Sequence, residues 1–118
     1  MPMMAAVFPI VPGKTDEWRA WTAELAGPRR EEFEASRRSV GVHERTYLQS
    51  TPMGDLVIIT LEGDDPARSF GQLAGADDEF SKWFIAKATE FHGFDMSQLP
   101  AGDPSELVID SDRAVVPA

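Results

Sequence analysis

The 118-residue chain contains no cysteine, no asparagine and no long hydrophobic run. Without cysteine there are no disulfides and no thiolate chemistry, although this absence does not fix the compartment. No segment reaches the roughly 18 apolar residues that a membrane span needs, and the first residues lack the basic leader and apolar stretch of a secretory signal. We therefore expect a cytoplasmic protein without membrane association.

The motifs of nucleotide binding and of serine hydrolases are also missing. The sequence has no GxGxxG, no Walker loop and no GxSxG. Acidic runs occur at residues 64–65 and 77–79, but both stand at expected helix starts, where helix capping accounts for them. Without a DxDxDG loop or a His/carboxylate spacing, we expect no metal site and no cofactor.

Basic residues are scarce in the second part of the chain. Residues 1–50 carry seven Lys+Arg and seven Asp+Glu, whereas residues 51–118 carry four and thirteen, so the whole net charge of −9 arises there. An acidic surface repels phosphate backbones and anionic lipid. Nucleic-acid binding is therefore not expected.

Length and composition indicate one globular domain. A hydrophobic content of 42% with 26% charged residues is typical of a soluble protein with a packed core. We expect the single domain to cover residues 1–118, with a structured core over 3–110 and a loose tail over 111–118.

The hydrophobic pattern predicts four strands and three helical segments. The strands are expected at residues 3–11, 42–50, 55–62 and 107–109. A long helix up to Val40, kinked at Gly27-Pro28, keeps one apolar stripe in phase. Shorter helices follow at 66–74 and from 77 to Gly93. This order predicts an α+β, ferredoxin-like fold, in which a four-stranded antiparallel sheet carries its helices on one face.

The expected strand at 55–62 is apolar on both sides. Val57, Ile59 and Leu61 point one way, and Leu56, Ile58 and Thr60 point the other way. Burying each aliphatic side chain contributes about 1.5–3 kcal/mol, so the second face also favours a cover. We expect a homodimer whose sheets pack face to face. The alternatives are a tolerated apolar patch or a cover supplied by the C-terminal tail.

Four stretches carry a resemblance to known proteins: GKTDEWRAW, GPRREEFEASRR, YLQSTPMGDLVIITLEGDDP and DDEFSKWF. With the element order, they resemble a functionally unassigned bacterial family of the dimeric α/β-barrel superfamily, related to antibiotic-biosynthesis monooxygenases, heme-degrading monooxygenases and stress-responsive barrel proteins. The resemblance covers most of residues 3–110. It implies the dimeric barrel fold, which hosts cofactor-free oxygenation, isomerisation, lyase reactions and non-catalytic roles.

Three residues are candidates for catalysis. Arg29 lies on the inward stripe of the long helix, so it either pairs with Glu32 beyond the sheet edge or faces a ligand. His43 stands in the second strand as an acid–base candidate or a surface residue. His92 precedes Gly93, where it either interacts with the helix end or serves as an acid or base.

Heme-degrading relatives use an Asn, a Trp and a His, and the comparison fails here. The chain has no Asn, and nine residues at ~100° each place Trp83 and His92 on opposite sides of a regular helix. Heme ligation is therefore not expected.

Aromatic side chains are the candidate ligand-binding residues. Trp18, Trp21 and Trp83 lie on inner helix faces, where they either fill the core or bound a cleft between the helices and the sheet, with Tyr47 beside it. The leading hypothesis is a dimeric barrel protein that binds a small apolar or aromatic molecule in that cleft, as a binding protein or as a cofactor-independent monooxygenase or isomerase. The alternative is a non-catalytic assembly or stress-responsive protein.

Overall fold

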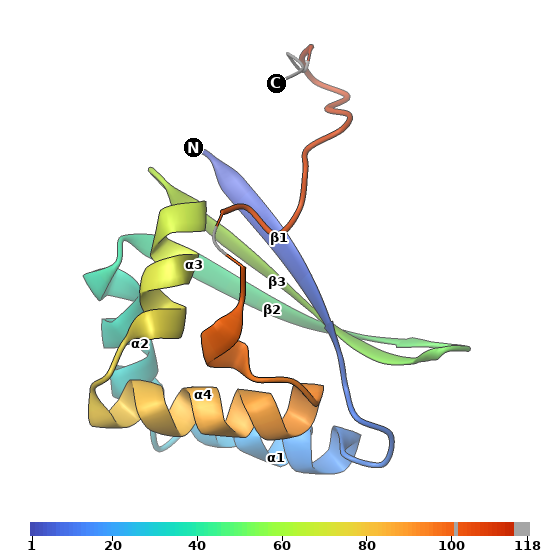
Figure 1. Ribbon diagram of the computed structural model, residues 1–118, viewed down its shortest axis with the longest axis vertical. Helices are drawn as coiled ribbons and strands as arrows, with labels where there is room; N and C mark the ends of the chain where they lie inside the picture. The colour runs from blue at the N-terminus through green and yellow to red at the C-terminus, as the bar shows by residue number, and fades with distance from the viewer. Residues whose placement is uncertain (101, 115–118) are drawn as a thin grey trace.

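The computed structural model describes residues 1–100 and 102–114, which form an α+β fold with helices on one side of an antiparallel sheet (Figure 1). The sheet has three strands in the order β1-β3-β2, and both strand pairs are antiparallel. The strands are β1 (Met3–Pro9), β2 (Val42–Thr51) and β3 (Gly54–Gly63). The helices are α1 (Thr15–Ala26), α2 (Arg30–Ser39), α3 (Pro66–Gly75) and α4 (Glu79–His92), and a 3-10 turn, η1 (Met96–Gln98), follows them.

The hairpin between β2 and β3 forms as the sequence predicts. Gly54 adopts a φ of 120°, a value that side chains with a Cβ rarely tolerate. The Thr51 hydroxyl donates to the Gly54 carbonyl and accepts from the Met53 amide, which closes the turn. The hairpin tip extends away from the helices (Figure 1).

Helices α3 and α4 begin and end where their capping residues stand. Asp65 accepts from the Arg68 amide at the start of α3, and Asp78 accepts from the Ser81 amide at the start of α4. Gly93, with a φ of 79°, ends α4 in the left-handed conformation. The expected pair of short helices after β3 is confirmed.

The expected kinked helix is two helices. Gly27 has φ −117° and ψ −102°, outside the helical region, and Pro28 has no N–H to continue the ladder. Helix α1 runs beside α4, whereas α2 turns toward the start of β2 (Figure 1). The apolar residues of both helices nevertheless share one core cluster, in which Trp18, Trp21 and Leu25 of α1 and Phe33 of α2 pack with Val57 of β3.

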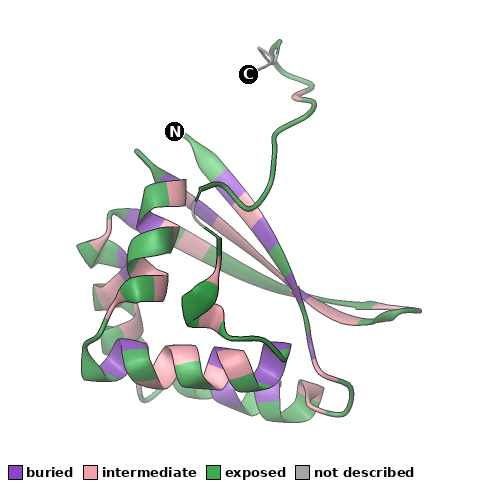
Figure 2. Ribbon diagram, viewed as in Figure 1, coloured by how far each residue is buried: buried purple, intermediate pink, exposed green. Residues whose placement is uncertain are grey.

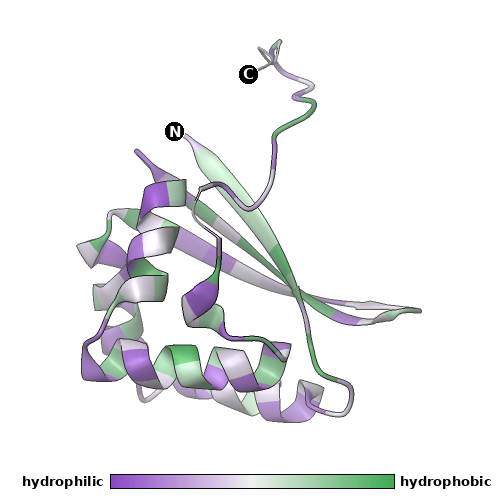
Figure 3. Ribbon diagram, in the orientation of Figure 1, coloured by the Kyte–Doolittle hydropathy of each residue, from purple (hydrophilic) through white to green (hydrophobic). Residues whose placement is uncertain are grey.

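The expected strand at 107–109 is not formed. Leu107, Val108 and Ile109 are exposed, with Ile109 at 81% (Figure 2). Just before this segment, the Ser105 hydroxyl donates to the Ala5 carbonyl at the free edge of β1. The chain then runs away from that edge (Figure 1). Among the described residues no strand pairs with this free edge of β1, and the segment that Figure 3 colours as hydrophobic stays exposed. Of the expected loose tail, residues 111–114 are exposed and 115–118 lie outside the described residues.

The two faces of the sheet differ in what covers them. The covered face holds Met4, Ala6, Phe8, Val57 and Leu61, all buried beneath the helices. The opposite side, here called the open face, carries the alternate residues of each strand. Its members are Met3, Ala5, Val7, Leu56, Ile58, Thr60, Glu62, His43, Arg45, Tyr47 and Gln49. No described residue packs over Val7 or Tyr47, which are 55% and 52% exposed.

Candidate functional site

A cavity of about 250 Å³ lies between the helices and the covered face of the sheet. Aromatic and aliphatic side chains from β1, α1, α2, β3 and α4 form most of its wall. They include Phe8, Trp18, Trp21, Leu25, Phe33, Val57, Ile59 and Phe84. An apolar cavity of about 150 Å³ is enough to take up benzene, so this one has room for more than a single ring. We call it the helix–sheet cavity.

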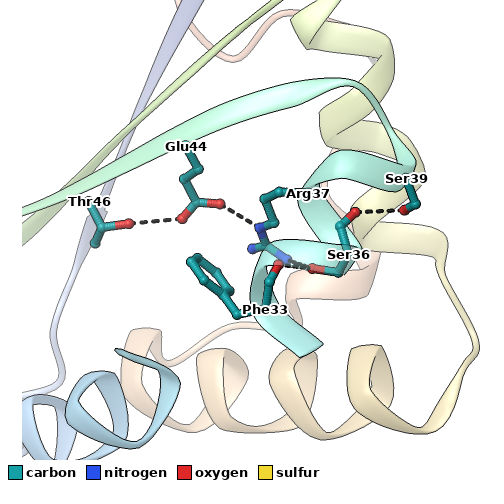
Figure 4. Close-up of polar contacts among 6 residues, drawn as sticks. All are labelled: Phe33, Ser36, Arg37, Ser39, Glu44 and Thr46. Atoms are coloured by element: carbon teal, nitrogen blue, oxygen red, sulfur yellow. Dashed lines mark hydrogen bonds and ion pairs between the residues drawn. The ribbon is translucent and has the colours of Figure 1, made fainter. Parts of the chain in front are cut away.

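One part of the wall is charged. The Nε of Arg37 on α2 donates to Oε1 of Glu44 on β2 at 2.8 Å, and the two side chains are only 10% and 6% exposed (Figure 4). The Thr46 hydroxyl donates to the other carboxylate oxygen at 2.8 Å, and Nη1 of Arg37 donates to the Ser36 hydroxyl at 2.9 Å. Arg37, Glu44 and Thr46 all line the cavity.

The guanidinium of Arg37 also packs on aromatic rings. Its Cζ lies 4.5 Å from the ring centroids of both Phe33 and Phe84, whose planes are 16° apart. A desolvated cation over an aromatic face gains about 2 kcal/mol. Together with the carboxylate of Glu44, the rings hold the planar guanidinium in one orientation.

A buried ion pair of this kind is weak evidence for a stability role. Taking two charges out of water costs several kcal/mol for each ion, and apolar residues of similar volume are often as stable in the same place. Arg37 and Glu44 nevertheless stand in the wall of an otherwise apolar cavity. Folding stability alone is therefore a weak explanation for their position.

His92 contributes the second titratable part of the wall. Its Nδ1 lies 2.8 Å from the Pro9 carbonyl oxygen, and because a carbonyl only accepts, Nδ1 carries the proton. Burial lowers the pKa of His92 below its ordinary value, and the hydrogen bond to Pro9 opposes this shift. The neutral ring therefore presents an unprotonated Nε2, which can accept a hydrogen bond or a proton.

The indole of Trp21 has an unused donor. Trp21 is buried in the cavity wall, and its Nε1–H has no hydrogen-bond partner among the described residues. A buried donor without a partner costs about 1–3 kcal/mol. Such unpaired buried donors are rare in folded cores, so this N–H is an available donor in the cavity wall.

The residues singled out from the sequence divide into two groups. Trp18, Trp21 and His92 all line the helix–sheet cavity. His43 and Tyr47 are exposed on the open face, on the other side of the sheet from that cavity.

Arg29 and Trp83 form a separate contact outside the cavity wall. The Cζ of Arg29 lies 4.0 Å from the Trp83 ring centroid, and its Nε is 3.1 Å from Oε1 of Glu32. The expected pairing of Arg29 with Glu32 is confirmed. The two residues do not line the helix–sheet cavity, so Arg29 and Trp83 are not brought together with His92.

Sequence reasoning missed Arg37 and Glu44, although the signal was present. Arg37 follows Phe33 by four residues, which puts both side chains on the same helix face. Glu44 stands two residues after the buried Val42 in β2, so both side chains lie on the same face of the sheet and point toward the helices. A cation on the inward face of the helix and an anion on the inward face of the strand together indicate a buried ion pair.

The described residues contain no group of three or more His, Asp or Glu side chains arranged to hold a metal ion. Within residues 1–100 and 102–114, none of the helices has the length and apolar character to cross a membrane. Comparisons with protein families, with curated proteins and with solved structures give no match to this chain. The resemblance to the dimeric α/β-barrel superfamily therefore stays a prediction.

Proposed function

We propose that this protein binds a small apolar or aromatic molecule in the helix–sheet cavity. The observation that carries the proposal is a 250 Å³ space, walled by aromatic and aliphatic side chains, that also contains a buried Arg–Glu pair and a neutral histidine. Binding sites for small molecules combine an apolar lining with a few placed polar groups in this way.

Naphthalene is a suitable test ligand because its two fused rings exceed benzene in size and carry no polar group. Binding is measured by isothermal titration and by the change in fluorescence of the tryptophans. Leu73 on α3 lines the cavity, so Leu73→Trp places extra bulk inside it. The adjacent Gln72 is exposed, and Gln72→Trp adds a larger side chain to the same helix outside the cavity. We expect Leu73→Trp to weaken naphthalene binding at least about tenfold and Gln72→Trp to leave it unchanged.

Two results would contradict this function. One is the absence of naphthalene binding to the wild-type protein. The other is equal binding by the wild-type protein and by a folded Leu73→Trp variant, which would put the bound ligand elsewhere.

An enzymatic form of the proposal depends on His92. An unprotonated Nε2 on a ring that lines an apolar cavity suits a general base, since it can take a proton from a bound ligand and return it. Such proton transfer is what a cofactor-independent isomerase or monooxygenase needs. A ligand that turns over should lose its reaction in His92→Gln while binding is kept.

We further propose that the chain forms a homodimer through its open face, in a ferredoxin-like dimeric barrel. In support, Val7, Ile58 and Tyr47 form one row across the three strands, in which Val7 and Tyr47 stay exposed among the described residues. The exposed residues 107–109 lie close after the contact at the free edge of β1, where a fourth strand would complete the fold. If the cavity binds nothing, this surface supports the alternative of a non-catalytic assembly or stress-responsive protein.

A further inference from the structure

The charged groups of the helix–sheet cavity cancel one another. Arg37 is paired with Glu44, and the lowered pKa of His92 leaves that ring neutral at pH 7. An anionic ligand would have to compete with Glu44 for the guanidinium, and a cationic ligand would have to compete with Arg37 for the carboxylate. Bringing an uncompensated charge into an apolar cavity also carries a large desolvation cost. The cavity therefore favours an uncharged ligand.

Hydrogen-bond donors are in excess in the same wall. A guanidinium has five N–H donors, and the described residues accept two from Arg37, one at Glu44 and one at Ser36. Both carboxylate oxygens of Glu44 are already engaged, by Arg37 and by Thr46. The Nε1–H of Trp21 adds another donor without a partner among the described residues. The N–H donors of Arg37 and Trp21 that have no partner among the described residues therefore outnumber the acceptor that His92 offers in the same wall.

The guanidinium is held in place before any ligand arrives. Its contacts to the Phe33 and Phe84 rings and its hydrogen bond to Glu44 fix both the plane and the position of the group. A fixed donor loses little conformational entropy when an acceptor binds to it. The aromatic rings beside it also offer faces on which a flat ligand can stack.

We infer that the ligand is an uncharged aromatic molecule with a carbonyl oxygen, and that Arg37 is the residue that receives that oxygen. This inference rests on the proposed function and specifies its ligand class. The ring system of the ligand occupies the apolar part of the cavity, and the oxygen accepts from the guanidinium N–H groups that the protein leaves unused. Glu44 acts as a positioning residue, because it orients Arg37 without touching the ligand oxygen.

Three probes of the same ring size test the inference by isothermal titration: indane, 1-indanone and indane-1-carboxylate. Indane has no acceptor, 1-indanone adds one carbonyl oxygen, and the carboxylate adds a negative charge. We expect 1-indanone to bind about tenfold or more tightly than indane, because a hydrogen bond to a charged donor is among the stronger ones. We expect the carboxylate to bind more weakly than 1-indanone.

The matched variant replaces both members of the ion pair. Arg37→Met together with Glu44→Leu removes the donors without leaving a buried charge alone, which keeps the fold. In this double variant the ratio of the indane dissociation constant to the 1-indanone dissociation constant should fall to near one, while indane should bind as well as before or better. Arg29→Met is the control, since it removes an arginine that does not line the cavity, and the preference should be kept.

The outcomes separate this inference from the proposed function. If indane and 1-indanone bind equally, or if the carboxylate binds best, the inference is overturned while ligand binding in the cavity stands. If none of the three probes binds, both are overturned. A preference for 1-indanone that persists in a folded double variant assigns the carbonyl oxygen to another donor and overturns the role of Arg37.

Discussion

The covered face and the open face belong to the same three strands, and in β3 both are apolar. On the covered face Leu61 is fully buried and Val57 is 2% exposed, whereas on the open face Ile58 is half-buried between the exposed Val7 and Tyr47. In the part of the chain that the structure describes, the helices cover one side of the sheet and no second layer lies on the other (Figure 1). The difference shows that a strand can be apolar on both faces while the described part of the chain buries only one of them.

The covered face differs in a second way, because it includes a buried charge pair. Glu44 reaches Arg37 within the cavity wall, whereas Glu32 reaches Arg29 at the start of α2, where the side chains of Glu32 and Arg29 are 49% and 27% exposed. The two pairs have similar N–O distances of 2.8 and 3.1 Å. Their energetic roles should differ because water screens only the exposed pair.

The largest effect is expected for Glu44→Ala. This change leaves the guanidinium of Arg37 buried without its carboxylate, which should reduce the free energy of unfolding by about 3–5 kcal/mol. The matched variant Glu32→Ala breaks the exposed pair and should cost less than about 1 kcal/mol. Urea denaturation at pH 7 measures both values. Equal losses in the two variants would refute the contrast between the buried and the exposed pair.

Leu61→Ala should have the next largest effect. Leu61 packs with Met4 and Val42 under the helices, and its truncation should cost about 2–5 kcal/mol through lost burial and a new cavity. Because these contacts lie within one chain, the loss should not depend on protein concentration. Denaturation at two protein concentrations tests this, and a concentration-dependent loss would place Leu61 in an interface instead.

The sequence allowed much of the fold to be predicted, because its signals were local. Strand-forming stretches bounded by turn residues predicted three strands, Asp65 and Asp78 marked two helix starts, and Gly93 marked a helix end. The break at Gly27 was misjudged since apolar periodicity reports only the direction of each face, and two separate helices can share it.

The fourth strand and part of the site were less predictable because they depend on long-range contacts. The run at 107–109 has the composition of a strand, but a strand needs a paired neighbour as well as apolar side chains. Trp18, Trp21 and His92 were found from helix faces, whereas the pairing of Arg37 with Glu44 depends on how α2 meets β2.

A charge placed in the middle of the open face tests what covers it. Ile58→Lys puts an ammonium group between Val7 and Tyr47. In a homodimer packed through this face, the ammonium groups of both chains would be desolvated. We expect the dimer dissociation constant to rise at least about tenfold while the monomer stays folded. Analytical ultracentrifugation measures the constant, and circular dichroism checks the fold.

The control is Gln72→Lys, which adds the same charge on α3 away from the open face. Its dissociation constant should match that of the wild-type protein. A wild-type chain that remains monomeric at micromolar concentration would contradict the homodimer, and so would an Ile58→Lys variant that dimerises as tightly as the wild-type protein.

The smallest effect is a pH dependence that arises from His92. Burial lowers the pKa of this ring in the folded protein, so between its ordinary value of 6.5 and the lowered value the unfolded chain binds more protons. The free energy of unfolding should therefore fall as the pH drops below about 6.5, by no more than about 1.4 kcal/mol per pH unit for one group.

His92→Gln removes the titrating ring, and the glutamine amide can still donate to the Pro9 carbonyl. The difference in the free energy of unfolding between pH 7.5 and pH 5.5 should therefore become smaller in this variant. His43→Gln is the control, because that side chain is exposed on the open face and does not line the cavity. Urea denaturation across this range compares the three proteins. If His92→Gln kept the wild-type slope and His43→Gln lost it, the titrating group would belong to the open face, and the neutral His92 of the cavity would no longer explain the pH dependence.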